Sequence, residues 1–122
     1  MSKKILIIED ETSLLNVLSE KLKLEGFEVL EAKNGEEGLG LAINQKPDLI
    51  LLDIIMPKMD GITMLRKLRE NTWGKHVPVI ILTNLSSGSD TLKSVEKNVF
   101  SCLIKSDWKL EDIVKKIKKA LG

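Results

Sequence analysis

The chain has 122 residues, of which 43% are hydrophobic, and its formal net charge at pH 7 is +1. This length suits one domain with a core that needs no structural metal, and the balanced charge gives no sign of a nucleic-acid or anionic-membrane partner. The single cysteine, Cys102, excludes an internal disulfide and favours a reducing cytoplasm. One cysteine and one histidine nearly exclude an ordinary zinc site. No apolar run reaches the about 20 residues that span a bilayer, and the first residues do not resemble a signal peptide.

Short apolar runs predict buried strands. Four runs are continuously apolar, as expected of parallel strands covered on both faces: 5–8, 49–52, 79–82 and 102–104. The segment 27–32 alternates charged and apolar residues instead, which is typical of a more exposed edge strand.

Amphipathic segments follow these runs. In the first, Leu15, Leu18 and Leu22 share one face, and Gly26 is expected to end the helix. The second opens at Asn34, with Glu37 three residues later in a pattern close to a capping box.

Three more helices are predicted after these two, at 62–70, at 90–97 and at the C-terminus. The helix at 90–97 is short and serine-rich, whereas the last one carries a clear apolar stripe with lysines on its other positions. The stripe consists of Leu110, Ile113, Val114, Ile117 and Leu121. Strand and helix thus alternate five times, which predicts one parallel sheet covered by helices on both faces. We expect one domain over residues 1–122, with no output domain after the last helix.

Polar residues follow four of the five predicted strands. Glu9 and Asp10 come after the first, Asp53 ends the third, Thr83 the fourth and Lys105 the fifth. The carboxyl ends of parallel strands meet at one edge of the sheet, where such folds bind ligands. Each residue alone has an ordinary structural reading, as a helix cap, a strand end or a solvated lysine. Their joint placement favours a site.

Three neighbouring carboxylates repel one another, and a hard divalent cation removes that cost. Mg²⁺ takes oxygen ligands and is usually bound through one or two carboxylates together with phosphate oxygens. A carboxylate held beside a metal and a lysine can attack phosphorus and form an aspartyl phosphate. The Thr83 hydroxyl and Lys105 would then stabilise charge on the transferring oxygens.

With these residues in place, the whole chain resembles the receiver domain of two-component response regulators. The most specific stretch is 47–61, PDLILLDIIMPKMDG, and 4–11, 78–83 and the strand end at Lys105 also match. The resemblance implies a flavodoxin-like (βα)5 fold with strand order 2-1-3-4-5. It also implies a Mg²⁺ (or Mn²⁺) site in which Asp10 and Asp53 bind the metal, Glu9 helps through water and Ile55 offers its main-chain carbonyl.

The resemblance further implies a phosphorylation-dependent switch rather than a turnover enzyme. Asp53 would accept the phosphoryl group from a phosphohistidine on a sensor histidine kinase or phosphotransfer protein, while Lys105 and Thr83 bind the group. The first helix and the loop after Lys105 would face that donor. Movement of Thr83 would alter the face formed by the fourth helix, fifth strand and fifth helix, read by an output protein or domain. We expect no direct nucleic-acid or membrane contact, and a monomer or a phosphorylation-linked dimer.

The sequence departs from the family pattern at several positions. Ser106 replaces the usual proline, so we expect a trans peptide bond there; Cys102 replaces an aromatic residue and Asn84 a small one. Ile55 and Leu85 are apolar where side chains tune hydrolysis, from which we infer a long-lived phosphorylated form. The weakly helical segment around 86–90 makes the fourth helix the expected moving element.

Three alternatives stay open on sequence grounds. A phosphatase of the haloacid-dehalogenase type would need a second acid where Ile55 stands. A flavin carrier would need a hydroxyl- and glycine-rich loop after the first strand, where this chain has Glu9 and Asp10. A pseudo-receiver would bind partners without phosphorylation, which Ser106 and Cys102 keep possible.

Overall fold

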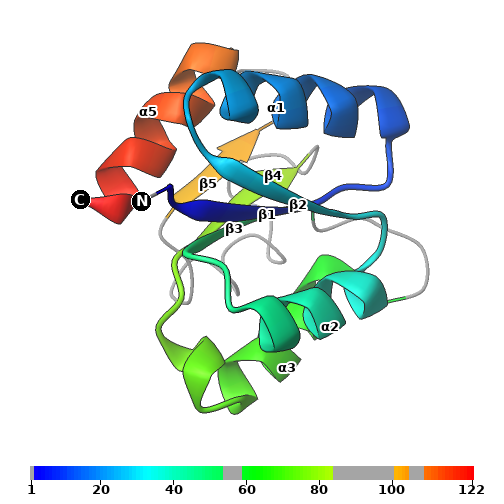
Figure 1. Cartoon of the computed structure of the whole chain (residues 1–122). Helices are drawn as coiled ribbons and strands as arrows, with labels where there is room; N and C mark the ends of the chain where they lie inside the picture. The colour runs from blue at the N-terminus through cyan, green and yellow to red at the C-terminus, as the bar shows by residue number, and fades with distance from the viewer. Residues whose placement is uncertain (1, 54–58, 84–100, 105–108) are drawn as a thin grey trace.

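The computed structural model describes residues 2–53, 59–83, 101–104 and 109–122. These residues form a parallel sheet between two helical layers (Figure 1). The strands are β1 (Lys4–Ile8), β2 (Glu28–Ala32), β3 (Leu49–Asp53), β4 (Val79–Thr83) and β5 (Ser101–Ile104). The helices are α1 (Thr12–Leu24), α2 (Gly35–Gln45), α3 (Gly61–Glu70), the short 3-10 helix η1 (Trp73–Lys75) and α5 (Leu110–Leu121).

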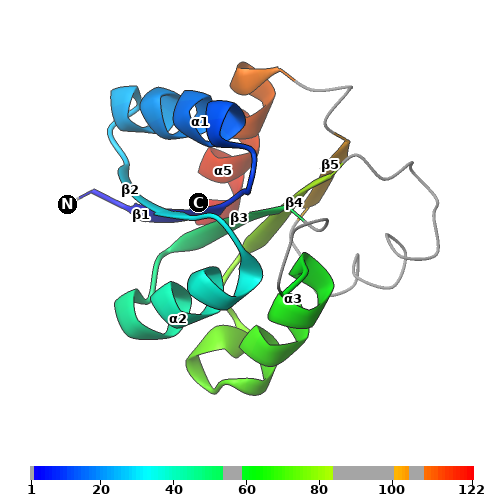
Figure 2. The ribbon, with the colours of Figure 1, turned by 90° about the vertical axis from the view of Figure 1, so that its right-hand side faces the viewer.

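The strands lie in the order β2-β1-β3-β4-β5, and every neighbouring pair is parallel. This order confirms the predicted doubly wound sheet, with β2 at an edge as its alternating sequence indicated. Figures 1 and 2 show α1 and α5 on one face of the sheet and α2 and α3 on the other. Among the described residues, no helix is both long enough and apolar enough to cross a bilayer.

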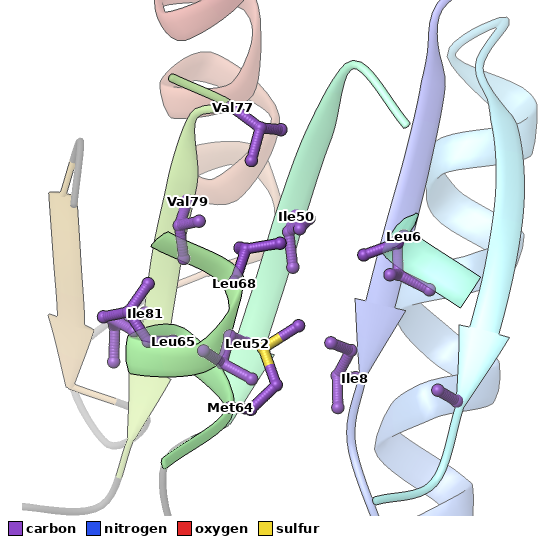
Figure 3. Close-up of a cluster of buried hydrophobic side chains, with 12 residues drawn as sticks. Leu6, Ile8, Ile50, Leu52, Met64, Leu65, Leu68, Val77, Val79 and Ile81 are labelled. Atoms are coloured by element: carbon purple, nitrogen blue, oxygen red, sulfur yellow. The ribbon is translucent and has the colours of Figure 1, made fainter. Parts of the chain in front are cut away.

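Each face of the sheet buries its own apolar cluster, because successive strand residues point to opposite faces. The face under α2 and α3 contains alternate residues of β1, β3 and β4 packed against α3 (Figure 3). The labelled members of this cluster are Leu6, Ile8, Ile50, Leu52, Met64, Leu65, Leu68, Val77, Val79 and Ile81. The other face packs against α1 and α5 through Ile5, Ile7, Leu49, Leu51, Ile80 and Leu82. Burial on both sides explains why the strands read as unbroken apolar runs.

Local signals set the helix ends. Gly26 has φ 93° and follows α1, as predicted for a helix stop. The Asn34 side chain accepts a hydrogen bond from the Glu37 N–H at 2.8 Å, which confirms the start of α2. α3 begins at Gly61, one residue earlier than predicted, because the Asp60 side chain accepts from the Thr63 N–H at 2.8 Å.

The connection from α3 to β4 differs from the sequence prediction. Trp73 begins η1, at a position where the sequence predicted no helix, and packs against the α2/α3-side cluster. The Asn71 side chain accepts from the Trp73 N–H at 3.0 Å, and Arg69 donates to the carbonyls of Gly74 and Val77, both at 2.8 Å. Burial lowers the pKa of the Arg69 guanidinium, which stays charged because its ordinary value is so high.

Several sequence predictions fall outside the described residues. They are the fourth helix at 90–97, the loop around Ser106, the positions of Asn84 and Leu85, and the surroundings of the Cys102 side chain. His76, the single histidine, is exposed.

Candidate functional site

The strand register brings the predicted acids to one edge of the sheet. Ile8 of β1 is opposite Leu52 of β3, so the residues that follow them, Glu9 and Asp53, come at the same level. Asp53 is in turn opposite Leu82 of β4, which places Thr83 one step further along. The carboxyl ends of three adjacent strands therefore deliver these side chains together.

The three acids form a compact group. One carboxylate oxygen from each of Glu9, Asp10 and Asp53 lies within 4.8 Å of the other two. Glu9 is 1% exposed and Asp53 is 4% exposed, whereas Asp10 is open to solvent. Thr83 is fully buried at the end of β4. The group thus combines two buried carboxylates with one, that of Asp10, which is exposed to solvent.

Main-chain hydrogen bonds hold Glu9 in this position. Its N–H donates to the Ala32 carbonyl of β2 at 2.9 Å, which extends the β1–β2 pairing by one residue. Its carboxylate Oε2 accepts from the Glu11 N–H at 3.1 Å, just before α1 begins. One oxygen of Glu9 is therefore directed toward the start of α1.

Such a cluster needs a positive charge. Carboxylates a few ångströms apart repel one another, and burial makes each negative charge costlier. Three converging carboxylates, two of them buried, supply the oxygen ligands that a hard divalent cation prefers. The residues present therefore fit Mg²⁺ on the chemistry of the donor set.

The structure thus brings together Glu9, Asp10 and Asp53, with Thr83 on the adjacent strand. Lys105 and the Ile55 carbonyl lie outside the described residues, so their roles stay predictions.

One contact next to the site was not predicted. The Gly35 N–H, at the start of α2, donates to the Met59 carbonyl at 3.0 Å. A glycine after a helix-capping asparagine is the only sequence signal for it, and that signal names no partner.

Comparison with known proteins fits this geometry. A family model described as the response regulator receiver domain matches residues 5–118. The chain belongs to this family. The receiver is accordingly a signalling module of two-component systems and not a turnover enzyme, which removes the phosphatase alternative. After β1 this chain has acids of the candidate metal site, where a flavin carrier would need a hydroxyl- and glycine-rich loop.

Two relatives of the receiver are longer proteins that match it over only part of their length. It is 37% identical over 105 residues to the response regulator PleD of Caulobacter vibrioides, an alignment that covers 86% of this chain and 23% of PleD. It is 38% identical over 96 residues to the alkaline phosphatase synthesis transcriptional regulatory protein PhoP of Bacillus subtilis, covering 79% of this chain and 39% of that protein. The receiver therefore spans less than half the length of these two relatives.

Solved structures match over the full fold. A CheY-like receiver domain protein from Methanospirillum hungatei JF-1 has a TM-score of 0.89 and 30% identity, with 99% of this chain and 94% of that chain covered. The receiver domain of the sensor histidine kinase PA1611 from Pseudomonas aeruginosa PAO1 has a TM-score of 0.90 and 25% identity, with 100% and 99% covered. That domain was solved with a magnesium ion coordinated in its active-site cleft.

Proposed function

We propose that the receiver is a phosphorylation-dependent switch in which Asp53 accepts a phosphoryl group with the help of Mg²⁺. The observation that carries the proposal is the convergence of Glu9, Asp10 and Asp53, with carboxylate oxygens within 4.8 Å of one another. Asp53 is the nucleophile because it ends the central strand β3, between the acids after β1 and the hydroxyl after β4. The donor is a phosphohistidine on a sensor kinase or phosphotransfer protein.

The phosphoryl transfer is a single exchange of bonds. A carboxylate oxygen of Asp53 attacks phosphorus, the bond from phosphorus to the donor imidazole nitrogen breaks, and its electron pair returns to the imidazole. Asp10 and Asp53 would hold Mg²⁺, with Glu9 nearby and the Ile55 carbonyl as a further ligand, and the ion would supply positive charge to neutralise the acids and to stabilise charge on the phosphoryl oxygens. Lys105 pairs with that charge and the Thr83 hydroxyl donates to it.

The signal leaves through β4 and β5. Thr83 is opposite Ile104 in the β4–β5 pairing, so a shift of the threonine toward the phosphoryl group acts on the strand that precedes α5. We propose that the face formed by the fourth helix, β5 and α5 responds. An output protein or domain then reads this face.

Mass spectrometry with a small phosphodonor tests the proposal. The wild-type chain, Asp53→Asn and Asp48→Asn are incubated with Mg²⁺ and acetyl phosphate, and intact masses are compared. Asp48 is a matched control because it is an exposed acid at the opposite end of β3. We expect one phosphoryl adduct on the wild type and on Asp48→Asn, and none on Asp53→Asn. A wild type without an adduct would favour a receiver that binds partners without phosphorylation.

A further inference from the structure

Two glycines of α2 contact the chain segments that flank the acidic site. Gly35 donates its N–H to the Met59 carbonyl at 3.0 Å, and Met59 follows Asp53 in the connection from β3 to α3. Gly38 lies against the side chain of Ile8, the residue before Glu9. One helix thus contacts Ile8, which directly precedes Glu9, and Met59, which lies in the connection after β3.

Neither position has room for a side chain. A Cβ on Gly35 would overlap the Met59 carbonyl oxygen and lie 2.9 Å from its carbonyl carbon, closer than real Cβ atoms approach. A Cβ on Gly38 would overlap the Ile8 side chain and lie 2.7 Å from its Cγ1. Ile8 is 1% exposed, within the cluster of Figure 3, so its side chain has little space to move aside. Gly40, in the same helix, has nothing within 4 Å of a built Cβ.

Both glycines have ordinary negative φ, so the contacts and not the backbone conformation require them. Glycine in a helix lowers stability by about 1 kcal/mol relative to alanine. The close contacts at positions 35 and 38 explain why glycine is nevertheless found there. The Asn34 cap fixes the start of α2, and the Gly35 N–H then donates to the Met59 carbonyl.

We propose that Gly35 and Gly38 are positioning residues of the metal site. They let α2 lie close enough to Met59 and Ile8 to fix the spacing between Asp53 and the Glu9–Asp10 pair. A side chain at either position moves one half of the site relative to the other, and the loss appears first in metal affinity. The inference rests on the proposed magnesium function and adds two residues that touch neither metal nor phosphate.

The test compares Mg²⁺ affinity with stability in the full chain. Dissociation constants come from ¹H–¹⁵N NMR titrations with MgCl₂, and thermal unfolding is followed by circular dichroism in EDTA. We expect Gly35→Ala and Gly38→Ala to weaken Mg²⁺ binding roughly 10-fold or more, the usual effect of disturbing groups that orient metal ligands. Gly40→Ala, the matched control, should keep the wild-type affinity and unfold at a higher temperature. Adding Ile8→Val to Gly38→Ala removes the overlapping methyl group and should restore part of the affinity.

The outcomes separate the two proposals. A wild type that does not bind Mg²⁺ contradicts the proposed function itself. A wild type that binds Mg²⁺, with glycine variants that unfold at lower temperature yet keep the wild-type dissociation constant, contradicts the positioning role alone. If Gly35→Ala does not fold, Gly38→Ala decides by the same criterion, because its overlap is with a side chain and not with backbone.

Discussion

A buried carboxylate next to two others lowers the stability of the fold, because like charges repel and burial removes their hydration. Asp53 is 4% exposed and within 4.8 Å of carboxylate oxygens of Glu9 and Asp10. At this separation like charges repel by a few kcal/mol at the effective dielectric of a protein. We therefore expect this repulsion to oppose folding when no cation is bound, and binding of a cation between the acids to relieve it.

Removing one of these charges should stabilise the metal-free protein. We expect Asp53→Asn to raise the free energy of unfolding by about 1–2 kcal/mol in EDTA, because the amide keeps the shape and loses the repulsion. Chemical denaturation of both forms measures the difference. The gain should shrink when Mg²⁺ is added, since the cation stabilises the wild type more. A less stable Asp53→Asn in EDTA would show that the acids do not repel one another.

Ser19 is a buried polar residue with a different explanation. It lies on the inner side of α1, and its Oγ has no hydrogen-bond partner among the described residues. A buried hydroxyl without a partner costs free energy, and alanine is also the better helix former. We expect Ser19→Ala to stabilise the fold by about 0.5–1 kcal/mol in urea denaturation. A loss of stability would show that the hydroxyl is hydrogen-bonded in solution.

At the scale of elements, α1 and α5 are joined by ion pairs on one face of the sheet. Lys118 of α5 donates to Glu25, at the end of α1, at 3.0 Å, and Lys21 of α1 is 3.4 Å from Glu111 of α5. The hydrogen bond and charge of Lys118 lower the pKa of Glu25 below its ordinary value of 4.5. These groups are solvated, so they define the relative position of the two helices more than they add stability.

The Lys118–Glu25 ion pair predicts the direction in which the stability changes with pH. Because the pKa of Glu25 is lower in the folded state, its contribution is present above pH 4.5 and is lost as the pH falls through the folded-state pKa. Lys118→Met should return the pKa of Glu25 toward 4.5, as measured by carboxyl ¹³C NMR. Lys119→Met, a control on the same helix, should leave it unchanged. Equal pKa values in the wild type and Lys118→Met would contradict the pairing.

The strands and helices show which parts of the fold could be predicted from the sequence. The strands were predicted to within a residue or so, because burial on both faces makes them continuously apolar. Their observed ends extend to Lys4 and Thr83, since main-chain pairing continues past the last apolar residue. α2 was predicted from its Asn34 cap although Gly38 and Gly40 weaken it. Packing of Gly38 on Ile8 explains one of these glycines, and no periodicity reveals such a contact.

For the whole molecule, the position of the acidic site was easier to predict from the sequence than the individual contacts in the surrounding structure. Parallel strands bring Glu9, Asp10 and Asp53 to the same edge of the sheet, so the strand pattern was enough to predict which edge carries the acids. The start of η1 at Trp73 was missed because it depends on single side-chain contacts to the main chain from Asn71. The Gly35–Met59 hydrogen bond was missed because it joins the start of α2 to a connection that is distant in sequence. Sequence patterns report burial and strand ends, whereas such individual contacts emerge only with the fold.

The most direct test of the account is to locate the phosphoryl group on the wild-type chain. After incubation with acetyl phosphate and Mg²⁺, borohydride reduces an aspartyl phosphate to homoserine, and tandem mass spectrometry identifies the reduced position. We expect homoserine at position 53 alone, and none when EDTA replaces Mg²⁺. Reduction at Asp10 or Asp60 in place of Asp53, or at Asp53 equally without a divalent cation, would contradict it.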